Sequence, residues 1–319
     1  MTARLEDIGF YTLSNARTKQ ASACSPLWRC EIVLTDRCNF KCPYCRGLRP
    51  DLVGAMRLEQ ANRTLDYWIA DGLKNVRFSG GEPTLYPHLE ALVTRCKLGG
   101  VERIAVSTNG SASKHYYESI LAAGVNDVSV SLDGCCSSIG DAMSGVKGQW
   151  DRVVENIRWL AERTYVTVGM VFTAANLPQC REAVVFASRL GVADVRIIPA
   201  AQYASALTSL ATLPEDTLSR LPILRYRIEN ARQGRPVRGT VEKHRCALVL
   251  DDMAVAHMWH FPCIIYLREG GDPIGRVGPD MRGEREAWMH KHEPWNDPIC
   301  SKMCLDVCCD YNDTYARYH

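Results

Sequence analysis

The sequence has no excess of charge of either sign and no long apolar run. Its 319 residues carry 38 Lys and Arg against 36 Asp and Glu, a formal net charge of +2. Such a balance gives no field that favours nucleic acid or a membrane surface as a general partner. No stretch approaches the ~20 apolar residues of a membrane span, and the first residues lack the apolar segment of a signal peptide. We therefore expect a cytoplasmic protein with no membrane and no nucleic acid among its partners.

What the sequence does contain is cysteine, 15 residues in all. In a chain of this length without an export signal, closely spaced cysteines indicate metal ligands or redox chemistry rather than disulfides. One group lies near the start of the chain: Cys38, Cys42 and Cys45. A second group lies near the end: Cys246, Cys263, Cys300, Cys304, Cys308 and Cys309. The two groups predict two sites.

The middle of the chain alternates short β-branched runs with amphipathic segments. Six runs have the continuous apolar character of strands buried on both faces, at residues 31–34, 75–78, 103–107, 127–131, 165–173 and 194–198. Helices are expected between them, at 58–70, 87–97, 114–123, 149–162 and 178–190. Repeated strand–helix units predict a parallel sheet, and six units are too few to close an eight-stranded barrel of ~250 residues. The predicted fold class is α/β, as an open-sided partial (β/α)6 TIM-like barrel.

After residue 199 the alternation of strand-like and helix-like segments becomes irregular. Residues 213–232 are expected to be helical, and 233–236 (Gln-Gly-Arg-Pro) form a turn or linker. From about residue 241 the chain is rich in Cys, His, Trp, Pro and Gly and shows little periodicity. We therefore predict an N-terminal extension over 1–29, the barrel over 30–235, and a small cysteine-rich domain over 240–319.

The first cysteine group directly follows the first predicted strand, as Cys38-Asn-Phe-Lys-Cys42-Pro-Tyr44-Cys45. This spacing places three thiolates in one loop, and thiolates are the natural ligands of iron–sulfur clusters. Three ligands leave one iron of a [4Fe-4S] cube open to a cofactor or substrate. A zinc knuckle and reduced core cysteines are the alternatives, but a zinc site needs a fourth ligand, which the loop lacks. The loop also lies at the C-terminal end of a strand, where barrels build their active sites.

These motifs resemble the radical S-adenosylmethionine (SAM) superfamily over roughly residues 30–200. The loop matches its CxxxCxΦC motif, with the aromatic Tyr44 before the last cysteine, and Gly80-Gly81-Glu82-Pro83 matches the GGEP motif that binds the amino group of SAM in the family. Further matches end the third, fourth and sixth strands. The resemblance implies that SAM is bound by Tyr44, Gly80, Gly81, Glu82, Asn109, Ser131, Asp133 and Ile198.

The resemblance also implies the chemistry. The open iron chelates SAM, and one electron breaks the S–C5′ bond to give a 5′-deoxyadenosyl radical that abstracts hydrogen from a substrate. A flavodoxin- or ferredoxin-type protein is the expected electron donor. One departure is visible, because relatives with Ser-Leu-Asp-Gly often carry an arginine about a dozen residues later, and residues 141–145 contain none. The group that contacts the carboxylate of SAM is therefore not identified by the motifs.

The second cysteine group resembles the auxiliary-cluster domains called SPASM or twitch, in which two cysteines bracket a β-hairpin. We expect one auxiliary [4Fe-4S] cluster here, held by Cys246, Cys263, Cys300 and Cys304, with Cys308 or Cys309 as substitutes. A zinc site that combines cysteines with His257, His260, His290 or His292 is the alternative. Cys135 and Cys136 follow the fourth-strand motif and are candidate hydrogen donors to a substrate radical, although buried, inert cysteine is the commoner outcome.

Relatives with this combination of domains modify ribosomally made peptides or small molecules, and the fold does not choose between them. The sequence favours a peptide substrate narrowly. Radical modification of a sugar, an aminoglycoside or a nucleoside is the second hypothesis, and an iron–sulfur scaffold or sensor without enzymatic activity is the third.

Overall fold

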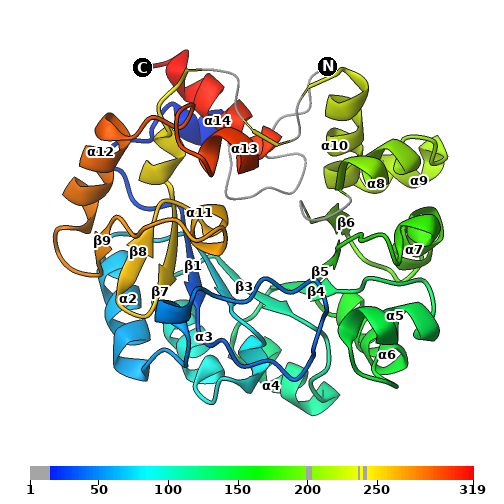
Figure 1. Ribbon diagram of the computed structural model, residues 1–319. Coiled ribbons are helices and arrows are strands. Elements are labelled where there is room, and N and C mark those ends of the chain that lie inside the picture. The colour runs from blue at the N-terminus through cyan, green and yellow to red at the C-terminus, as the bar shows by residue number, and fades with distance from the viewer. Residues whose placement is uncertain (1–14, 199–202, 236–237, 240–242) are drawn as a thin grey trace.

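The computed structural model describes residues 15–198, 203–235, 238–239 and 243–319. A nine-stranded sheet forms its centre, in the order β6-β5-β4-β3-β2-β1-β7-β8-β9. The strands are β1 (Arg29–Val33), β2 (Asn75–Ser79), β3 (Arg103–Thr108), β4 (Asp127–Ser131), β5 (Tyr165–Met170), β6 (Asp194–Ile197), β7 (Asp252–Ala256), β8 (Trp259–Phe261) and β9 (Gly275–Arg276). The first seven run parallel, and β8 and β9 are antiparallel additions. The sheet is an open arc, which confirms the predicted partial barrel (Figure 1).

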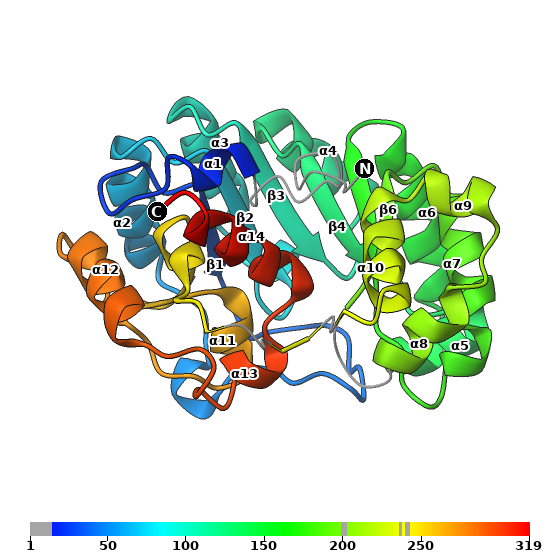
Figure 2. The same cartoon turned by 90° about the horizontal axis from the view of Figure 1, so that it is seen from above.

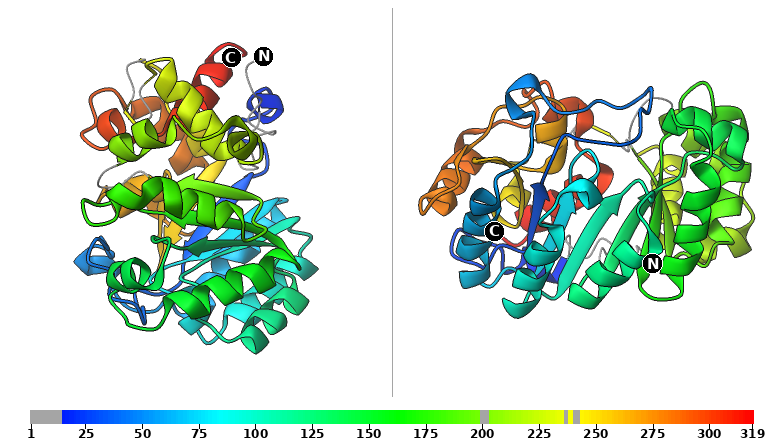
Figure 3. Two further views of the ribbon diagram at one scale, coloured as in Figure 1. Left: turned by 90° about the vertical axis from the view of Figure 1, so that its right-hand side faces the viewer. Right: turned by 90° about the horizontal axis from the view of Figure 1, so that it is seen from below.

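Helices of the barrel half cover the outside of this arc. They are α2 (Leu58–Ala70), α3 (Leu89–Leu98), α4 (Lys114–Ala123), α5 (Ser137–Ser144), α6 (Trp150–Ala161) and α7 (Cys180–Ser188). Figure 3 shows them as a layer along one face of the sheet. Apolar side chains recur at helical spacing on their inner faces, as at Val153, Ile157 and Leu160 of α6, all of which are buried. Local signals set the ends, since Ser113 Oγ caps α4 and Gly124 ends it with a φ of 137°.

The segment after β6 departs from the expectation of one long helix over residues 213–232. It forms α8 (Tyr203–Leu210), α9 (Glu215–Ser219) and α10 (Pro222–Arg232). The interruption lies at Pro222, because a proline has no N–H for the preceding turn and forces the residue before it out of the helical conformation. Leu221 accordingly has a non-helical backbone (φ −122°, ψ 74°), and α10 begins with Pro222 in its first turn.

The C-terminal region continues the barrel sheet, because β7 pairs in parallel with β1 along its whole length. The region also contains more regular structure than its sequence pattern indicated: α11 (Ile264–Arg268), α12 (Met281–Lys291), α13 (Cys300–Met303) and α14 (Asp306–Ala316). A short N-terminal helix, α1 (Asn15–Thr18), packs against α14. Viewed from above, α11, α13 and α14 lie together beside the barrel strands (Figure 2). The predicted boundary at residues 235–240 falls partly outside the described residues and stays a prediction. None of the described helices combines the length and apolar character that a membrane crossing requires.

Candidate active site

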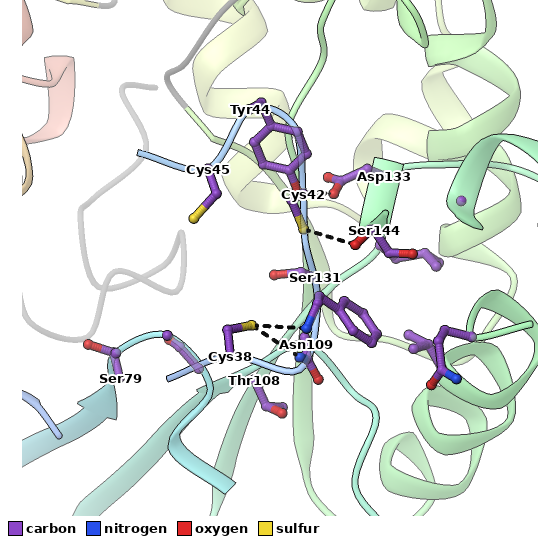
Figure 4. A pocket seen from close by; sticks show the side chains of 18 of the residues that line it. Cys38, Cys42, Tyr44, Cys45, Ser79, Thr108, Asn109, Ser131, Asp133 and Ser144 are labelled. Carbon is purple, nitrogen blue, oxygen red and sulfur yellow. Dashed lines mark hydrogen bonds between the residues drawn. The ribbon is translucent and has the colours of Figure 1, made fainter. Parts of the chain in front are cut away.

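The loop between β1 and residue 50, here called the cysteine loop (residues 34–49), crosses the C-terminal ends of the barrel strands. Cys38, Cys42 and Cys45 all line one cavity of about 300 Å³ at this end of the sheet. In Figure 4 their three sulfur atoms face a common space. No further cysteine and no histidine is among the described residues that line the cavity. Three converging thiols and an open fourth position fit a [4Fe-4S] cluster that binds a cofactor.

Backbone and amide groups already surround these thiols. Cys38 Sγ accepts hydrogen bonds from the Phe40 backbone N (3.4 Å) and from Asn109 Nδ2 (3.7 Å). The Cys42 thiol donates to the Ser144 carbonyl (3.8 Å), and burial raises the pKa of Cys42 to about 11. A bound metal displaces such protons, because only the thiolate is a ligand. Hydrogen bonds from N–H groups to a ligand sulfur, such as those at Cys38, shift the reduction potential of an iron–sulfur cluster.

The cavity wall brings together six of the eight residues that the motifs assigned to SAM: Tyr44, Gly80, Gly81, Asn109, Ser131 and Asp133. Asp133 follows β4 and receives the Tyr44 hydroxyl and the Val171 backbone N–H. Burial raises the pKa of its carboxyl to about 6, although both hydrogen bonds act in the opposite direction. The Tyr44–Asp133 bond therefore ties the cysteine loop to the end of β4.

The two glycines of the GGEP motif pack against the cysteine loop itself. Gly81 N donates to the Thr35 carbonyl (2.6 Å), and a Cβ built on Gly81 would lie 2.3 Å from the Arg37 carbonyl oxygen. A Cβ on Gly80 would lie 2.3 Å from the Thr35 oxygen, and the φ of Gly80 is 153°. Glycine is required here because backbone lies against backbone, a reason additional to the close approach of a ligand.

Glu82 and Ile198 are the two motif residues that do not line the cavity. Glu82 is fully buried beneath the wall, where its carboxylate accepts from Thr108 Oγ1 (2.8 Å), Asn109 N (2.6 Å) and Thr84. These bonds hold the ends of β2 and β3 together, so Glu82 supports the wall from behind. Ile198 extends β6, and its backbone N donates to the Met170 carbonyl (2.8 Å).

The candidate hydrogen donors Cys135 and Cys136 are also outside the cavity lining. Cys135 is partly buried against the hydrophobic core, and Cys136 lies at the start of α5 with its sulfur 3.4 Å from Ser138 Oγ. That contact and the backbone N–H of Ile139 lower the pKa of Cys136. Their donor role stays a prediction that this arrangement does not favour.

The structure adds lining residues that the motifs did not indicate. Glu31 lies on β1, receives Ser79 Oγ (2.8 Å), and pairs with Arg29. Arg268 reaches the same cavity from the end of α11, about 190 positions after the GGEP motif. No local sequence pattern marks Arg268, since its position depends on how the C-terminal region folds onto β1.

The second cysteine group converges as well. Cys246 and Cys263 flank the β7–β8 hairpin, and α13 and α14 bring the remaining thiols to them. A small cavity between these elements is lined by apolar side chains and five cysteines: Cys246, Cys263, Cys300, Cys304 and Cys308. Burial, with the neighbouring Cys308, raises the pKa of Cys246 to about 12, and burial also raises the pKa of Cys263 and Cys300. An all-sulfur donor set in a dry pocket fits an iron–sulfur cluster.

The other candidate ligands lie at the margin of this pocket or away from it. Cys309 is absent from the lining, although its sulfur lies 3.8 Å from that of Cys304. His292 Nε2 lies 3.6 Å from Cys300 Sγ, and together with Asp297 these residues could hold a metal ion. His260 is committed elsewhere, between Glu284 and Arg285, and His257 Nε2 lies 3.1 Å from the Leu52 carbonyl.

Comparison with known proteins agrees with this geometry. Residues 32–177 match the model of the radical SAM superfamily. A curated relative, the probable GTP 3′,8-cyclase of Metallosphaera sedula, is 25% identical over 177 residues, which cover 54% of this chain and 56% of the relative. The chain thus spans about half the length of this relative, and less of the next ones.

Two solved structures share the fold. His-tagged anSMEcpe with bound AdoMet, which is SAM, has a TM-score of 0.66 and 16% identity, over 92% of this chain and 96% of the other. Streptococcus suis SuiB bound to its precursor peptide SuiA has a TM-score of 0.59 and 15% identity, over 92% of this chain and 77% of SuiB. In both cases the likeness extends beyond the barrel half.

Proposed function

Since this chain belongs to the radical SAM superfamily, we propose that it cleaves SAM reductively and uses the 5′-deoxyadenosyl radical to abstract hydrogen from a substrate. The observation that carries this proposal is the convergence of Cys38, Cys42 and Cys45 on one cavity beside the GGEP turn. A [4Fe-4S] cluster bound by these thiols supplies the electron for cleavage and the open iron that holds SAM.

The remaining lining residues have roles that follow from their positions. Gly80 and Gly81 keep the GGEP backbone against the cysteine loop, and Asn109 donates to a ligand sulfur while facing the cavity. Asp133 and Ser131 offer oxygen acceptors at the end of β4, where the hydroxyl and ammonium groups of SAM can be bound. Phe40, Leu132 and Trp150 add apolar surface that excludes water from the site.

Anaerobic reconstitution tests the proposal. The protein supplied with iron, sulfide, SAM and dithionite should form 5′-deoxyadenosine, and the variant with Cys38, Cys42 and Cys45 all replaced by Ala should form none. Cys24→Ala is the matched control, because Cys24 is exposed and outside both cysteine-lined cavities. Formation of 5′-deoxyadenosine by the triple variant at the wild-type rate would contradict the assignment. A flavodoxin or ferredoxin should replace dithionite as the electron donor.

The C-terminal pocket is proposed to hold an auxiliary [4Fe-4S] cluster on Cys246, Cys263, Cys300 and Cys304, with Cys308 as the available substitute. The protein should then contain about eight iron atoms per chain, and about four in the triple variant of the cysteine loop. Zinc at one equivalent with iron near four would favour instead a mixed site that includes His292.

For the substrate we propose a peptide. The likeness to SuiB with its precursor peptide covers 92% of this chain and therefore extends into the C-terminal region, which supports this choice. The charges of the cavity agree, because a nucleoside triphosphate requires several cationic partners and Arg268 is the one cation among the described lining residues. The sequence similarity to GTP 3′,8-cyclases favours GTP as the second candidate.

A stimulation assay separates the two substrates. A peptide substrate should increase the rate of 5′-deoxyadenosine formation and undergo a mass change, whereas GTP should do neither. If GTP stimulates the reaction and is consumed in it, the peptide proposal is wrong and the cyclase reaction replaces it.

A further inference from the structure

The motifs identify no partner for the carboxylate of SAM, since residues 141–145 contain no arginine. This carboxylate needs strong N–H donors once it is removed from water, because an unpaired buried charge is costly. Among the described residues that line the cavity, Arg268 is the single cationic side chain. The acidic lining residues Glu31 and Asp133 suit the cationic groups of SAM and not its carboxylate.

The guanidinium of Arg268 is held in a fixed place. Its NH1 donates to the Gly47 carbonyl (3.2 Å) in the cysteine loop, and its NH2 donates to the Gly80 carbonyl (3.0 Å) in the GGEP turn. These are its two hydrogen bonds within the described part of the chain, so three of its five N–H groups are left for a ligand. Gly80 belongs to the turn that binds the methionine end of SAM in the superfamily. The guanidinium of Arg268 therefore lies beside the expected position of the methionine end.

No carboxylate among the described residues forms an ion pair with Arg268. The charge of Glu31 acts on Arg268, but Glu31 forms its own ion pair with Arg29 at 2.5 Å. Burial lowers the pKa of Arg268. The guanidinium of Arg268 is partly buried and hydrogen-bonds only to carbonyl oxygens among the described residues. Binding an anion therefore lowers its free energy more than it would for an arginine that already has a carboxylate partner.

We propose that Arg268, supplied by the C-terminal region, binds the methionine carboxylate of SAM and replaces the arginine that the fourth-strand motif lacks. This inference rests on the proposed function, because it concerns the same cavity. The position of α11 supports this proposal: the helix follows Cys263, whose sulfur accepts a hydrogen bond from Tyr266 N (3.5 Å), and it ends at Arg268. The C-terminal region thus both lines its own cysteine pocket and completes the SAM cavity.

A thermodynamic cycle, in which two ligands are bound by two proteins, tests the inference. The ligands are SAM and decarboxylated SAM, and their dissociation constants are measured by anaerobic equilibrium dialysis on cluster-loaded wild-type protein and on Arg268→Gln. The variant should bind SAM about tenfold or more weakly, the usual scale of one charge-assisted pair, while its affinity for decarboxylated SAM stays within about threefold. Arg268→Lys should recover part of the loss, because it keeps the charge but not the fork.

Arg276→Gln is the matched control, since Arg276 on β9 also belongs to the C-terminal region but is exposed and lines neither cysteine-lined cavity. Equal weakening for both ligands would make Arg268 a structural clamp and would overturn the inference, as would an unchanged affinity for SAM. If Arg268→Gln does not load its cluster, the same comparison is made with Arg268→Lys, which should bind SAM more weakly without a matching loss for decarboxylated SAM. Failure of the wild-type protein to bind SAM would instead contradict the proposed function itself.

Discussion

Gly81 has no room for even one methyl group. A Cβ at this position would lie 2.3 Å from the Arg37 carbonyl oxygen and 2.4 Å from that of Asp36, both in the backbone that leads into Cys38. We expect Gly81→Ala to displace the cysteine loop, to cost on the order of 1–3 kcal/mol in the free energy of unfolding, and to reduce iron binding by about half. Iron per chain and thermal unfolding measure both effects.

Gly283 provides the matched control for that substitution. It lies within α12, has no atom within 4 Å of a built Cβ, and has no positive φ. Gly283→Ala should therefore stabilise the protein by up to about 1 kcal/mol through helix propensity and leave the iron content unchanged. A Gly81→Ala protein with full iron and an unchanged melting temperature would show that the turn can move away from the loop.

Single residues also show where sequence motifs stop being informative. The motifs identify the residue types around the cavity but not the direction of each side chain: the Glu82 carboxylate accepts from Thr108 and Asn109, and its contact with SAM stays a prediction. Arg268 carries no motif, because its place depends on long-range packing and not on its neighbours in the sequence. The cysteine spacing predicted well, since three thiols within eight residues must lie close together whatever surrounds them.

At the scale of helices and strands, the apolar patterns located β1 to β6 to within a few residues of their observed bounds. Helices α2 and α4 matched as well, because their periodicity and their end signals agree. The later elements were less predictable. Strands β8 and β9 are three and two residues long, and α12 and α14 carry cysteines, histidines or charges that obscure a period. Such elements are formed by tertiary contacts rather than by their own patterns.

His260 connects two of these elements, β8 and α12, and gives a test at the same scale. Its Nδ1 accepts from Arg285 NH1 (3.2 Å), and its Nε2–H donates to Glu284 (2.8 Å), so the ring must be neutral to keep both bonds. Burial and the charge of Arg285 lower the pKa of His260 to about 3, while burial and Asp280 raise the pKa of Glu284.

The pH dependence of the free energy of unfolding follows from the difference between the pKa of His260 in the folded and in the unfolded chain. The unfolded chain takes up a proton at His260 near pH 6.5 and the folded chain does not until about pH 3, so this residue makes the protein less stable as the pH falls between those values. Replacing His260 by Gln should remove up to about 1.4 kcal/mol per pH unit from the slope of unfolding free energy against pH in that window. Denaturant unfolding at several pH values measures it. His115→Gln is the control, because His115 is exposed, and equal slopes in all three proteins would refute the account.

For the whole molecule, the central fact is that the C-terminal region is part of the barrel sheet. Strand β7 lies between β1 and β8, and β1 would be an edge strand without it. Buried polar contacts join the same parts of the chain: Arg17 and Tyr311 both bind the carboxylate of Asp251, which has no exposed surface. Arg282 of α12 binds Asp71 at the end of α2. We therefore expect the barrel and the C-terminal region to unfold as one cooperative unit.

Truncation tests this expectation. A chain that ends at residue 234 would expose Cys30 and Ile32 of β1, which are fully buried, together with a row of unpaired backbone groups. It should aggregate or melt without a cooperative transition, and it should hold little iron on the cysteine loop even though Cys38, Cys42 and Cys45 are all present. The full-length protein prepared without iron is the control, because it lacks the metal but keeps β7. It should still melt cooperatively. A truncated chain that melts like this metal-free protein and loads about four irons would establish the barrel as an independent domain and would contradict the single cooperative unit.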